Sequence, residues 1–250
     1  MKFNSLFVIL FCFLINGYSQ TVQNIYLDEI NQIIPYQRFK QKVSSKVYTS
    51  TKFYDKDNAY HKLDFAYYMG KLDSERKGQL FLLLSQRINV DTSKTIVIHY
   101  RDTLKALSSY PKYDSIIKLP DGKHRHLGSH RRFIKEHLSC IQSHRGKETQ
   151  LYHFFEVNEG HPLTFEEIKW FQDPSGTVKK VFQSKFSQST YWFLVIHPNG
   201  DFAVRNNISA SLNDKWNHFL KHKKWEKYLQ RFLEEYYYLN PKIAKEQGKL

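Results

Sequence analysis

Short hydrophobic runs separated by polar turns dominate the chain from about residue 94 onward. Residues 95–100 form a β-branched run and residues 150–157 a second apolar run, and both patterns predict buried strands. Tyr191–Ile196 gives the strongest strand signal, and the turn over residues 197–200 predicts a hairpin with a return strand at 201–205. These patterns predict one central sheet, with the first run and Tyr191–Ile196 in adjacent interior strands.

Apolar residues recur at helical spacing between the predicted strands. Residues 131–143 predict a helix, and Thr164 predicts the N-cap of a second helix because two glutamates follow it near the helix start. A long third helix is expected to begin at Ser211 and to end by residue 240. The segment between residues 101 and 128 is polar and predicts a loop. The stripe of the first helix consists of Phe133, His137, Cys140, Ile141 and His144.

Residues 20–93 have a sparser apolar pattern than the rest of the chain. Residues 77–88 predict the clearest helix of this region, and residues 25–34 have a weak helical pattern. Residues 47–60 are polar and rich in tyrosine. We therefore predict a mainly helical N-terminal extension over residues 20–93, which packs against a domain formed by residues 94–250 and does not fold alone.

Residues 1–19 have the pattern of a secretory signal peptide. Lys2 is their only charge, an apolar run over residues 6–15 follows, and Gly17 and Ser19 are small residues at the positions that a signal peptidase requires. The run is too short to span a bilayer core of about 30 Å as a helix. We expect cleavage after Ser19 and an exported mature chain, periplasmic or extracellular, without a membrane span. An uncleaved N-terminal anchor is the alternative.

Composition and charge exclude several classes of protein. The hydrophobic fraction of 41% in 250 residues, with a mean hydropathy of -0.59, allows a packed core and excludes a polytopic membrane protein. The formal net charge is +14, and removal of the leader with Lys2 lowers it by one charge. Cys12 is lost as well, so Cys140 remains as the single cysteine of the mature chain. An internal disulfide, dithiol chemistry and a cysteine-rich zinc site are thereby excluded.

The order of the predicted elements resembles the thioredoxin-like superfamily. From residue 94 the order is strand, helix, strand, helix, strand, hairpin strand and helix. Residues 194–202, Leu-Val-Ile-His-Pro-Asn-Gly-Asp-Phe, are similar to the hairpin Phe-Leu-Ile-Asp-Pro-Asp-Gly-Lys-Ile of secreted members of that superfamily. The resemblance implies an α/β fold, with a thioredoxin-like mixed sheet and helices on both faces.

The features that this superfamily uses for disulfide exchange are missing. The family's Cys-x-x-Cys motif follows the first strand, but residues 101–107 contain no cysteine, and Tyr191 stands at the position of the family's cis-proline. The resemblance therefore implies a scaffold without disulfide exchange. Cys140 lies in the middle of a predicted helix between apolar residues, which favours a buried and inert thiol. A lone reactive thiol is the alternative.

Residues 123–132 form the densest unusual segment, for which three interpretations remain open. Three imidazoles there could bind zinc or copper, although five nearby cations oppose a metal ion electrostatically. Cations that flank a predicted helix start could bind a phosphate or sulfate instead, and a solvated basic face is the third interpretation. The imidazoles are those of His124, His126 and His130. The cations of the anion site are Lys123, Arg125, Arg131 and Arg132.

The functional expectation follows from the export signal and the missing thiols. We expect a non-catalytic, exported thioredoxin-like protein with a binding or envelope-maintenance role, without disulfide exchange and without a cofactor. Its partner is expected to be a protein or a polyanionic envelope component, and export argues against nucleic acid. The alternative is a cysteine-independent enzyme or metal-binding protein that uses the segment with His124, His126 and His130.

Overall fold

The computed structural model of the chain describes residues 22–55, 57–119, 122, 124–144, 148–182, 191–206, 219–220 and 224–249. The expected leader, its cleavage site and the expected helix start at Ser211 lie outside these residues. The helices are α2 (Tyr36–Val43), α3 (Ser74–Ser85), α4 (His130–His144), α5 (Thr177–Phe182), α7 (Trp225–Leu239) and α8 (Pro241–Glu246). The strands are β1 (Gln23–Leu27), β2 (Tyr48–Asp55), β3 (Asn58–Phe65), β4 (Tyr67–Lys71), β5 (Thr95–Leu104), β6 (Ser115–Lys118), β7 (His124–Leu127), β8 (Thr149–Asn158), β9 (Thr164–Phe165), β10 (Ile168–Gln172), β11 (Tyr191–Ile196) and β12 (Asp201–Asn206).

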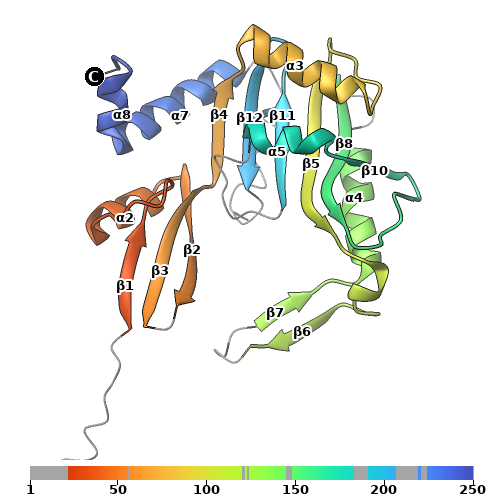
Figure 1. Ribbon diagram of the computed structural model, residues 1–250, viewed down its shortest axis with the longest axis horizontal. Coiled ribbons are helices and arrows are strands. Elements are labelled where there is room, and N and C mark those ends of the chain that lie inside the picture. The colour runs from red at the N-terminus through yellow and green to blue at the C-terminus, as the bar shows by residue number, and fades with distance from the viewer. Residues whose placement is uncertain are drawn as a thin grey trace, which may run out of the picture.

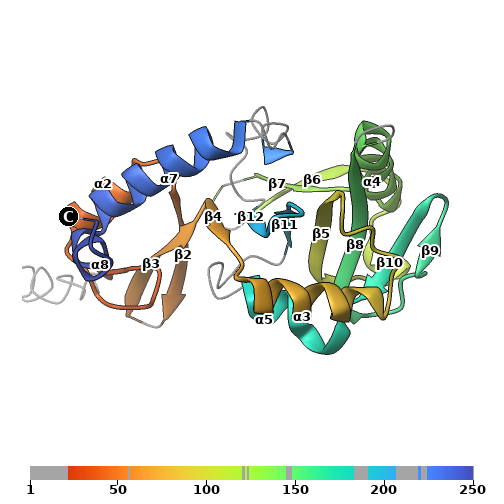
Figure 2. The same cartoon turned by 90° about the horizontal axis from the view of Figure 1, so that it is seen from above.

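A seven-stranded mixed sheet forms the centre of the molecule, in the order β4-β12-β11-β5-β8-β10-β9 (Figure 1). β5 lies between β8, to which it is parallel, and β11, to which it is antiparallel. The predicted adjacency of the first and third strands is confirmed. Helices cover both faces of this sheet: α4 and α7 lie on one side, and α3 and α5 lie on the other (Figure 2). The expected α/β class with a mixed sheet is confirmed. Among the described residues, no helix is both long and apolar enough to cross a membrane.

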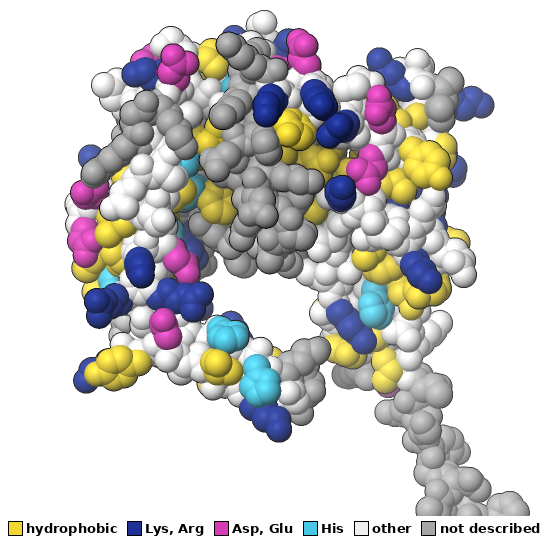
Figure 3. Space-filling model, turned by 180° about the vertical axis from the view of Figure 1, so that it is seen from behind, with side chains coloured by type: hydrophobic (Ala, Val, Ile, Leu, Met, Phe, Trp, Pro, Cys, Tyr) yellow, Lys and Arg dark blue, Asp and Glu magenta, His cyan; other side chains and the backbone are white. Residues whose placement is uncertain are grey.

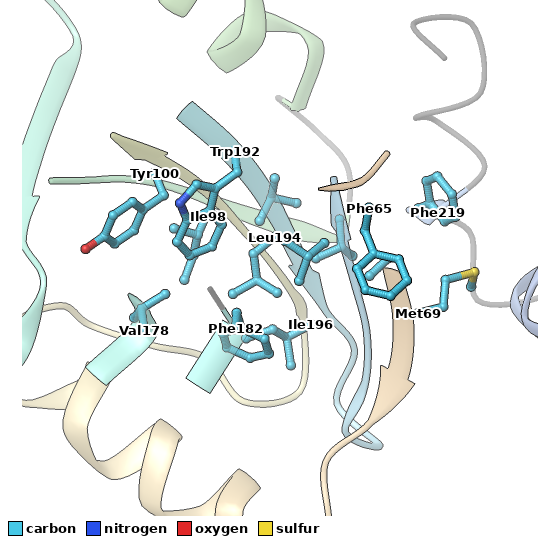
Figure 4. Packing of buried hydrophobic residues seen from close by; sticks show 14 of the residues in the cluster. Phe65, Met69, Ile98, Tyr100, Val178, Phe182, Trp192, Leu194, Ile196 and Phe219 are labelled. Carbon is cyan, nitrogen blue, oxygen red and sulfur yellow. The ribbon is translucent and has the colours of Figure 1, made fainter. Parts of the chain in front are cut away.

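β5 is deeply buried, because helices cover both of its faces. Its first six residues are buried, which suits a β-branched run between two layers of helices. On the α5 face the ring of Tyr100 stacks on Trp192 of β11, with their centroids 4.3 Å apart (Figure 4). The Tyr100 hydroxyl donates a hydrogen bond to the buried carboxylate of Asp173, at 2.9 Å. That carboxylate also accepts the backbone N–H groups of Val178 and Lys179, so it joins α5 to the sheet.

The predicted hairpin between β11 and β12 is confirmed. The backbone N–H of His197 donates to the carbonyl of Asp201 at 2.8 Å, which closes the turn. Gly200 has a φ of +91°, and a Cβ at that position would lie 2.9 Å from the carbonyl oxygen of Leu72. Both the backbone conformation and the close approach therefore require glycine. The buried His197 ring contacts the Thr95 hydroxyl through Nδ1 and the Phe219 carbonyl through Nε2, at 2.9 Å each.

The expectation of a mainly helical extension over residues 20–93 is wrong. This region contains four strands and two helices, and β1, β3 and β2 form a separate three-stranded sheet. Its tyrosine- and threonine-rich segment is β2, where aromatic side chains pair across strands, as Phe53 does with Tyr60. Residue 94 marks no structural division, because β4 pairs with β12 at the edge of the central sheet. Leu63 and Leu80 share one hydrophobic core with Leu194 of β11.

Two further expectations are corrected in the second part of the chain. Thr164 does not cap a helix, because residues 164–172 form the antiparallel pair β9 and β10. Buried and more exposed residues alternate in β10, with Ile168 and Trp170 inward, and this two-residue period overrides the capping signal. The predicted loop between residues 101 and 128 contains the hairpin β6–β7, which projects away from the central sheet (Figure 1).

Substitution of Leu80 tests whether the first ninety residues share the central core. Leu80 and Leu82 lie on the same helix, α3, but Leu80 is 1% exposed and Leu82 is 65% exposed. We expect Leu80→Ala to lower the free energy of unfolding by about 2–5 kcal/mol, as for other buried leucines. The matched change Leu82→Ala should alter it by less than about 0.5 kcal/mol.

Urea unfolding followed by tryptophan fluorescence and by circular dichroism measures both effects. A single transition that shifts as a whole in Leu80→Ala is the expected result. Two separate transitions, of which only one responds to Leu80→Ala, would contradict a shared core.

Candidate metal centre

The register of two parallel strands places two histidines side by side on one face of the sheet. His99 of β5 is the partner of His153 of β8, and their ring centroids lie 5.0 Å apart. Phe193 of β11 lies opposite His99, and Trp170 of β10 lies opposite His153. The centroid distances are 4.2 Å from His99 to Phe193 and 5.1 Å from His153 to Trp170. A continuous row of rings therefore crosses four strands.

Helix α4 places a third histidine on this row. The buried residues of α4 include Phe133, Ile134 and His137, which form the face that packs on the sheet. The His137 ring lies 5.2 Å from His153, centroid to centroid. One ligand-capable atom of each of His99, His137 and His153 lies within 4.8 Å of the other two. The three side chains are only 1–2% exposed, so they form a buried cluster, which we call the inner cluster.

Contacts outside the inner cluster orient its imidazoles. His137 Nδ1 lies 2.7 Å from the carbonyl oxygen of Phe133, and because a carbonyl only accepts, Nδ1 carries the hydrogen. The neutral ring then has its lone pair on Nε2. His99 Nε2 lies 3.1 Å from Cys140 Sγ. His153 Nε2 is buried and has no hydrogen-bond partner among the described residues. Second contacts of this kind commonly fix the tautomer of histidines that bind metals.

The environment keeps all three imidazoles neutral. Burial lowers the pKa of His99 well below its usual value, and the adjacent His153 and His137 lower it further. Burial and the Arg101 guanidinium lower the pKa of His137 to about 4. Burial lowers the pKa of His153 to about 3, with smaller effects from His137 and Arg101. Neutral imidazole is the form that binds a metal ion, so these rings are ready to ligate at neutral pH.

Cys140 lies beside the inner cluster instead of deep in the core. The expectation of a fully buried thiol is corrected, because Cys140 is partly exposed. Its mid-helix position on α4 is as predicted, but that turn of the helix lies next to His99 of β5. Sγ lies 3.1 Å from His99 Nε2 and 4.0 Å from Nδ1 of the buried His144. The thiol is therefore a neighbour of a possible ligand.

The structure does not bring His124, His126 and His130 together. His124 and His126 are exposed on β7, in the projecting hairpin, whose surface carries histidine and basic side chains (Figure 3). His130 lies on the first turn of α4, and its Nε2 is 3.1 Å from Nε2 of the buried His161. Among the described residues, the group of three metal-ligating side chains is the inner cluster. Strand register and helix packing bring together histidines other than the three of the alternative metal hypothesis.

The proposed anion site is brought together only in part. Lys123 lies outside the described residues, and Arg125 is exposed on β7. Arg131 and Arg132 line one surface hollow with Lys135, but Asp114 and Glu136 line it too. Arg132 Nε pairs with the Glu136 carboxylate at 3.0 Å. These carboxylates oppose an anion, and the anion site stays a prediction.

One signal in the sequence could have indicated the inner cluster. A polar residue inside a strand that is otherwise buried is more informative than an exposed one, and His99 and His153 each interrupt an apolar run. His137 lies on the apolar stripe of α4, between His130 and His144 at seven-residue spacing. What the sequence does not contain is the register that makes His99 and His153 neighbours.

The lowered pKa values predict how the stability of the metal-free protein depends on pH. The unfolded chain binds more protons than the folded chain between the usual histidine pKa of about 6.5 and the folded values. The free energy of unfolding should therefore be fully developed above about pH 6.5 and fall as the pH drops. His137, whose pKa falls to about 4, contributes a loss of roughly 3 kcal/mol across that interval.

Urea unfolding at several pH values between about 7 and 4 measures this dependence. His137→Phe should reduce the slope of this dependence, because it removes one of the three imidazoles that must protonate. His126→Phe, on the exposed hairpin, is the control and should keep the wild-type slope. A wild-type stability that is constant over this range contradicts neutral, buried imidazoles.

No protein-family model matches this chain, and no curated protein or solved structure matches it. The functional argument therefore rests on the residues of the site themselves.

Proposed function

We propose that this chain is an exported, non-catalytic binding protein on a thioredoxin-like scaffold, and that its ligand is a copper or zinc ion held by the inner cluster. The role is that of binding the ion in the cell envelope, without disulfide exchange. A thiol–disulfide exchange cycle needs a second thiol to resolve the mixed disulfide, and the mature chain has Cys140 alone.

The arrangement of the second part of the chain supports the thioredoxin-like scaffold. Apart from the hairpin β6–β7 and the strands β9 and β10, its elements follow the order β5, α4, β8, α5, β11, β12 and α7. The first two strands are parallel, and the last two form an antiparallel hairpin next to the first. Residues 101–107, where the resemblance places the Cys-x-x-Cys motif, contain no cysteine, and the start of α4 holds Ser129 and His130. The scaffold therefore lacks the chemistry of the superfamily at that position.

The observation that carries the proposed ligand is the convergence of three buried imidazoles. Tetrahedral ligands at about 2.0–2.1 Å from a zinc ion lie about 3.3 Å from one another. The inner cluster spans at most 4.8 Å, so side-chain movements of about 1 Å would bring three nitrogens into that geometry. Movements of this size need no change of fold.

The chemistry of the inner cluster restricts which ion fits. Imidazole ligands suit zinc and copper, and they do not suit calcium or magnesium, which prefer oxygen ligands. The positive charge of Arg101, which lowers the pKa of His137 and His153, also repels a metal cation. This repulsion is half as large for copper(I) as for a divalent ion. A soft sulfur also lies next to the ligand set, at Cys140. Both features favour copper(I) over zinc(II).

An unsatisfied buried nitrogen in the metal-free cluster also supports a bound ligand. A buried polar atom that lacks a partner costs about 1–3 kcal/mol, and His153 Nε2 is such an atom among the described residues. A bound ion would give this nitrogen a partner and connect it to the other two imidazoles. If this position needed only an aromatic ring for packing, phenylalanine would fill it without a buried nitrogen that lacks a partner.

The basic surface supports a second, weaker part of the proposal, which concerns the partner. The hairpin β6–β7 exposes Lys118 and Arg125, and it projects from the body. A polyanionic envelope component or an acidic protein remains the proposed partner of this surface. The metal-dependent enzyme at His124, His126 and His130 loses support, because these imidazoles are apart.

Substitution of single inner histidines tests the metal site. We expect the purified protein to bind copper(I) or zinc(II) stoichiometrically, measured by elemental analysis and by competition with a chromophoric chelator. His153→Leu and His137→Leu should each weaken the affinity by at least about 100-fold, because they remove a ligand. The control His126→Leu makes the same chemical change on the exposed hairpin and should leave the affinity unchanged.

Circular dichroism of each variant checks that it is folded. Stoichiometric binding that persists in His153→Leu and disappears in the triple alanine variant of His124, His126 and His130 would move the site to that segment. Failure of the folded wild-type protein to bind either ion overturns the proposed function.

Cys140 has a distinct expected effect, because it contacts a ligand and lies outside the inner cluster. We expect Cys140→Ala to keep the stoichiometry and to weaken copper(I) binding by about tenfold, as is typical for a group that contacts a ligand. Cys140→Ser should have an effect of the same size or smaller. A loss as large as that of His153→Leu would instead make the thiolate a direct ligand, and an unchanged affinity would give Cys140 no part in the site.

A further inference from the structure

A second pair of histidines lies near the inner cluster, at the start of α4. Nε2 of His130 and Nε2 of His161 are 3.1 Å apart, and their ring centroids are 5.2 Å apart. His130 is partly exposed, whereas His161 is 3% exposed. We call these two residues the outer pair. It connects the surface of the protein to its interior.

The loop between β8 and β9 holds His161 in a fixed orientation. The side chain of Asn158 accepts the backbone N–H of His161 at 2.8 Å and donates to its carbonyl at 2.9 Å. His161 Nδ1 lies 2.8 Å from the carbonyl oxygen of Pro162, so Nδ1 carries the hydrogen. The lone pair of Nε2 is therefore directed at His130. The separation of 3.1 Å between the two Nε2 atoms is close to the roughly 3.3 Å between two nitrogens on one tetrahedral ion.

The rings of Phe133 and Trp170 each lie close to both the outer pair and the inner cluster. The Phe133 ring lies 5.6 Å from His161 and 4.3 Å from His137, centroid to centroid. Trp170 lies 6.4 Å from His161 and 5.2 Å from His137. His130 and His137 are on the same stripe of α4, two turns apart, or about 10 Å along the axis. The two groups of imidazoles therefore contact the same two aromatic side chains, Phe133 and Trp170, which we call the aromatic wall.

A positive charge lies on the same wall. The Arg101 guanidinium stacks on Phe133, 4.7 Å from the ring centroid. Its charge acts on Tyr110, which packs on His130 of the outer pair, and on His137 and His153 of the inner cluster. An ion that passes from the surface to the interior meets this repulsion. Ligands just outside the barrier would hold the ion there and increase its rate of passage.

We propose that His130 and His161 are a loading site that takes a copper or zinc ion from solvent and transfers it to the inner cluster. This inference rests on the proposed function, because it names the route to the same buried site. The transfer is a ligand exchange without a redox step. His130 carries its hydrogen on Nδ1 when both Nε2 lone pairs hold the ion. Movement of the Phe133 and Trp170 rings would let the ion leave the outer pair and reach His137 Nε2, and His99 and His153 would then complete the inner site.

The reversible kinetics of metal uptake test this route. A loading site lowers the barrier in both directions, so its loss slows uptake and release equally and leaves the equilibrium affinity unchanged. We expect His130→Ala to slow zinc uptake and zinc release each by about tenfold. Stopped-flow exchange with a fluorescent chelator measures both rates on the folded full chain. The matched control is His126→Ala, which removes an exposed imidazole from the neighbouring hairpin and should change neither rate.

The outcomes separate this inference from the proposed function. A wild-type protein that binds no ion overturns both. A wild-type protein that binds while His130→Ala loads at the wild-type rate overturns the loading site alone. A His130→Ala variant with weaker affinity and unchanged uptake also overturns it, because the outer pair would then belong to the final site.

A second measurement isolates the outer pair. In His153→Leu, which lacks the inner site, we expect weak zinc binding that shifts the imidazole NMR signals of His130 and His161. The double variant His153→Leu/His130→Ala should lose this binding. Zinc that leaves both signals unshifted in His153→Leu contradicts a ligand role for the outer pair.

Discussion

The burial of β5 on both faces is the constraint on which the rest of the structure depends. A strand in the middle of a sheet that helices cover on both sides must supply every side chain with a partner from one layer or the other. Successive side chains of the strand point to opposite faces of the sheet, so each finds its partner in a different layer. Tyr100 meets Trp192 on the side of α5, and His99 meets Cys140 on the side of α4. The α4 side is where the inner cluster forms.

Among the described residues, the converging imidazoles distinguish the α4 face of the sheet from the α5 face. On the α5 face, Asp173 receives the Tyr100 hydroxyl and two backbone N–H groups, and Lys179 forms ion pairs with Asp102 and Glu156. Such contacts offset the cost of removing polar groups from water. Buried atoms without a hydrogen-bond partner among the described residues occur on both faces: Trp192 Nε1 and Asp102 Oδ1 on the α5 face, and His153 Nε2 on the α4 face. The three converging imidazoles make the α4 face the one that a metal ion would complete.

Much of the central sheet could be predicted from the sequence, because a run such as Tyr191–Ile196 has one stable solution, a strand buried between two layers. The helix with Phe133 and His137 was also visible, because its apolar stripe has the helical period. Local signals failed where two patterns competed. Thr164 had the chemistry of a helix cap, but the alternation that buries Trp170 fixed that segment as a strand.

The candidate site was the least predictable feature, for a physical reason. The histidines between residues 124 and 130 are close together in sequence. In the structure, two of them lie on a hairpin and the third lies at a helix start. His99 and His153 are far apart in sequence, and only the parallel register of β5 and β8 joins them. Register depends on the whole sheet, since a shift of one residue would turn His153 to the opposite face.

The same register makes metal binding and folding parts of one equilibrium. His99, His153 and His137 belong to β5, β8 and α4, and the unfolded chain does not hold these three elements together. An ion that binds only the folded state raises the free energy of unfolding by an amount that grows with its concentration relative to its dissociation constant. Because the inner cluster joins α4 to β5 and β8, this binding energy would stabilise the packing of α4 on the sheet. The loaded protein would remain sensitive to acid, because the unfolded chain protonates these imidazoles below about pH 6.5 and protons compete with the ion for the same nitrogens.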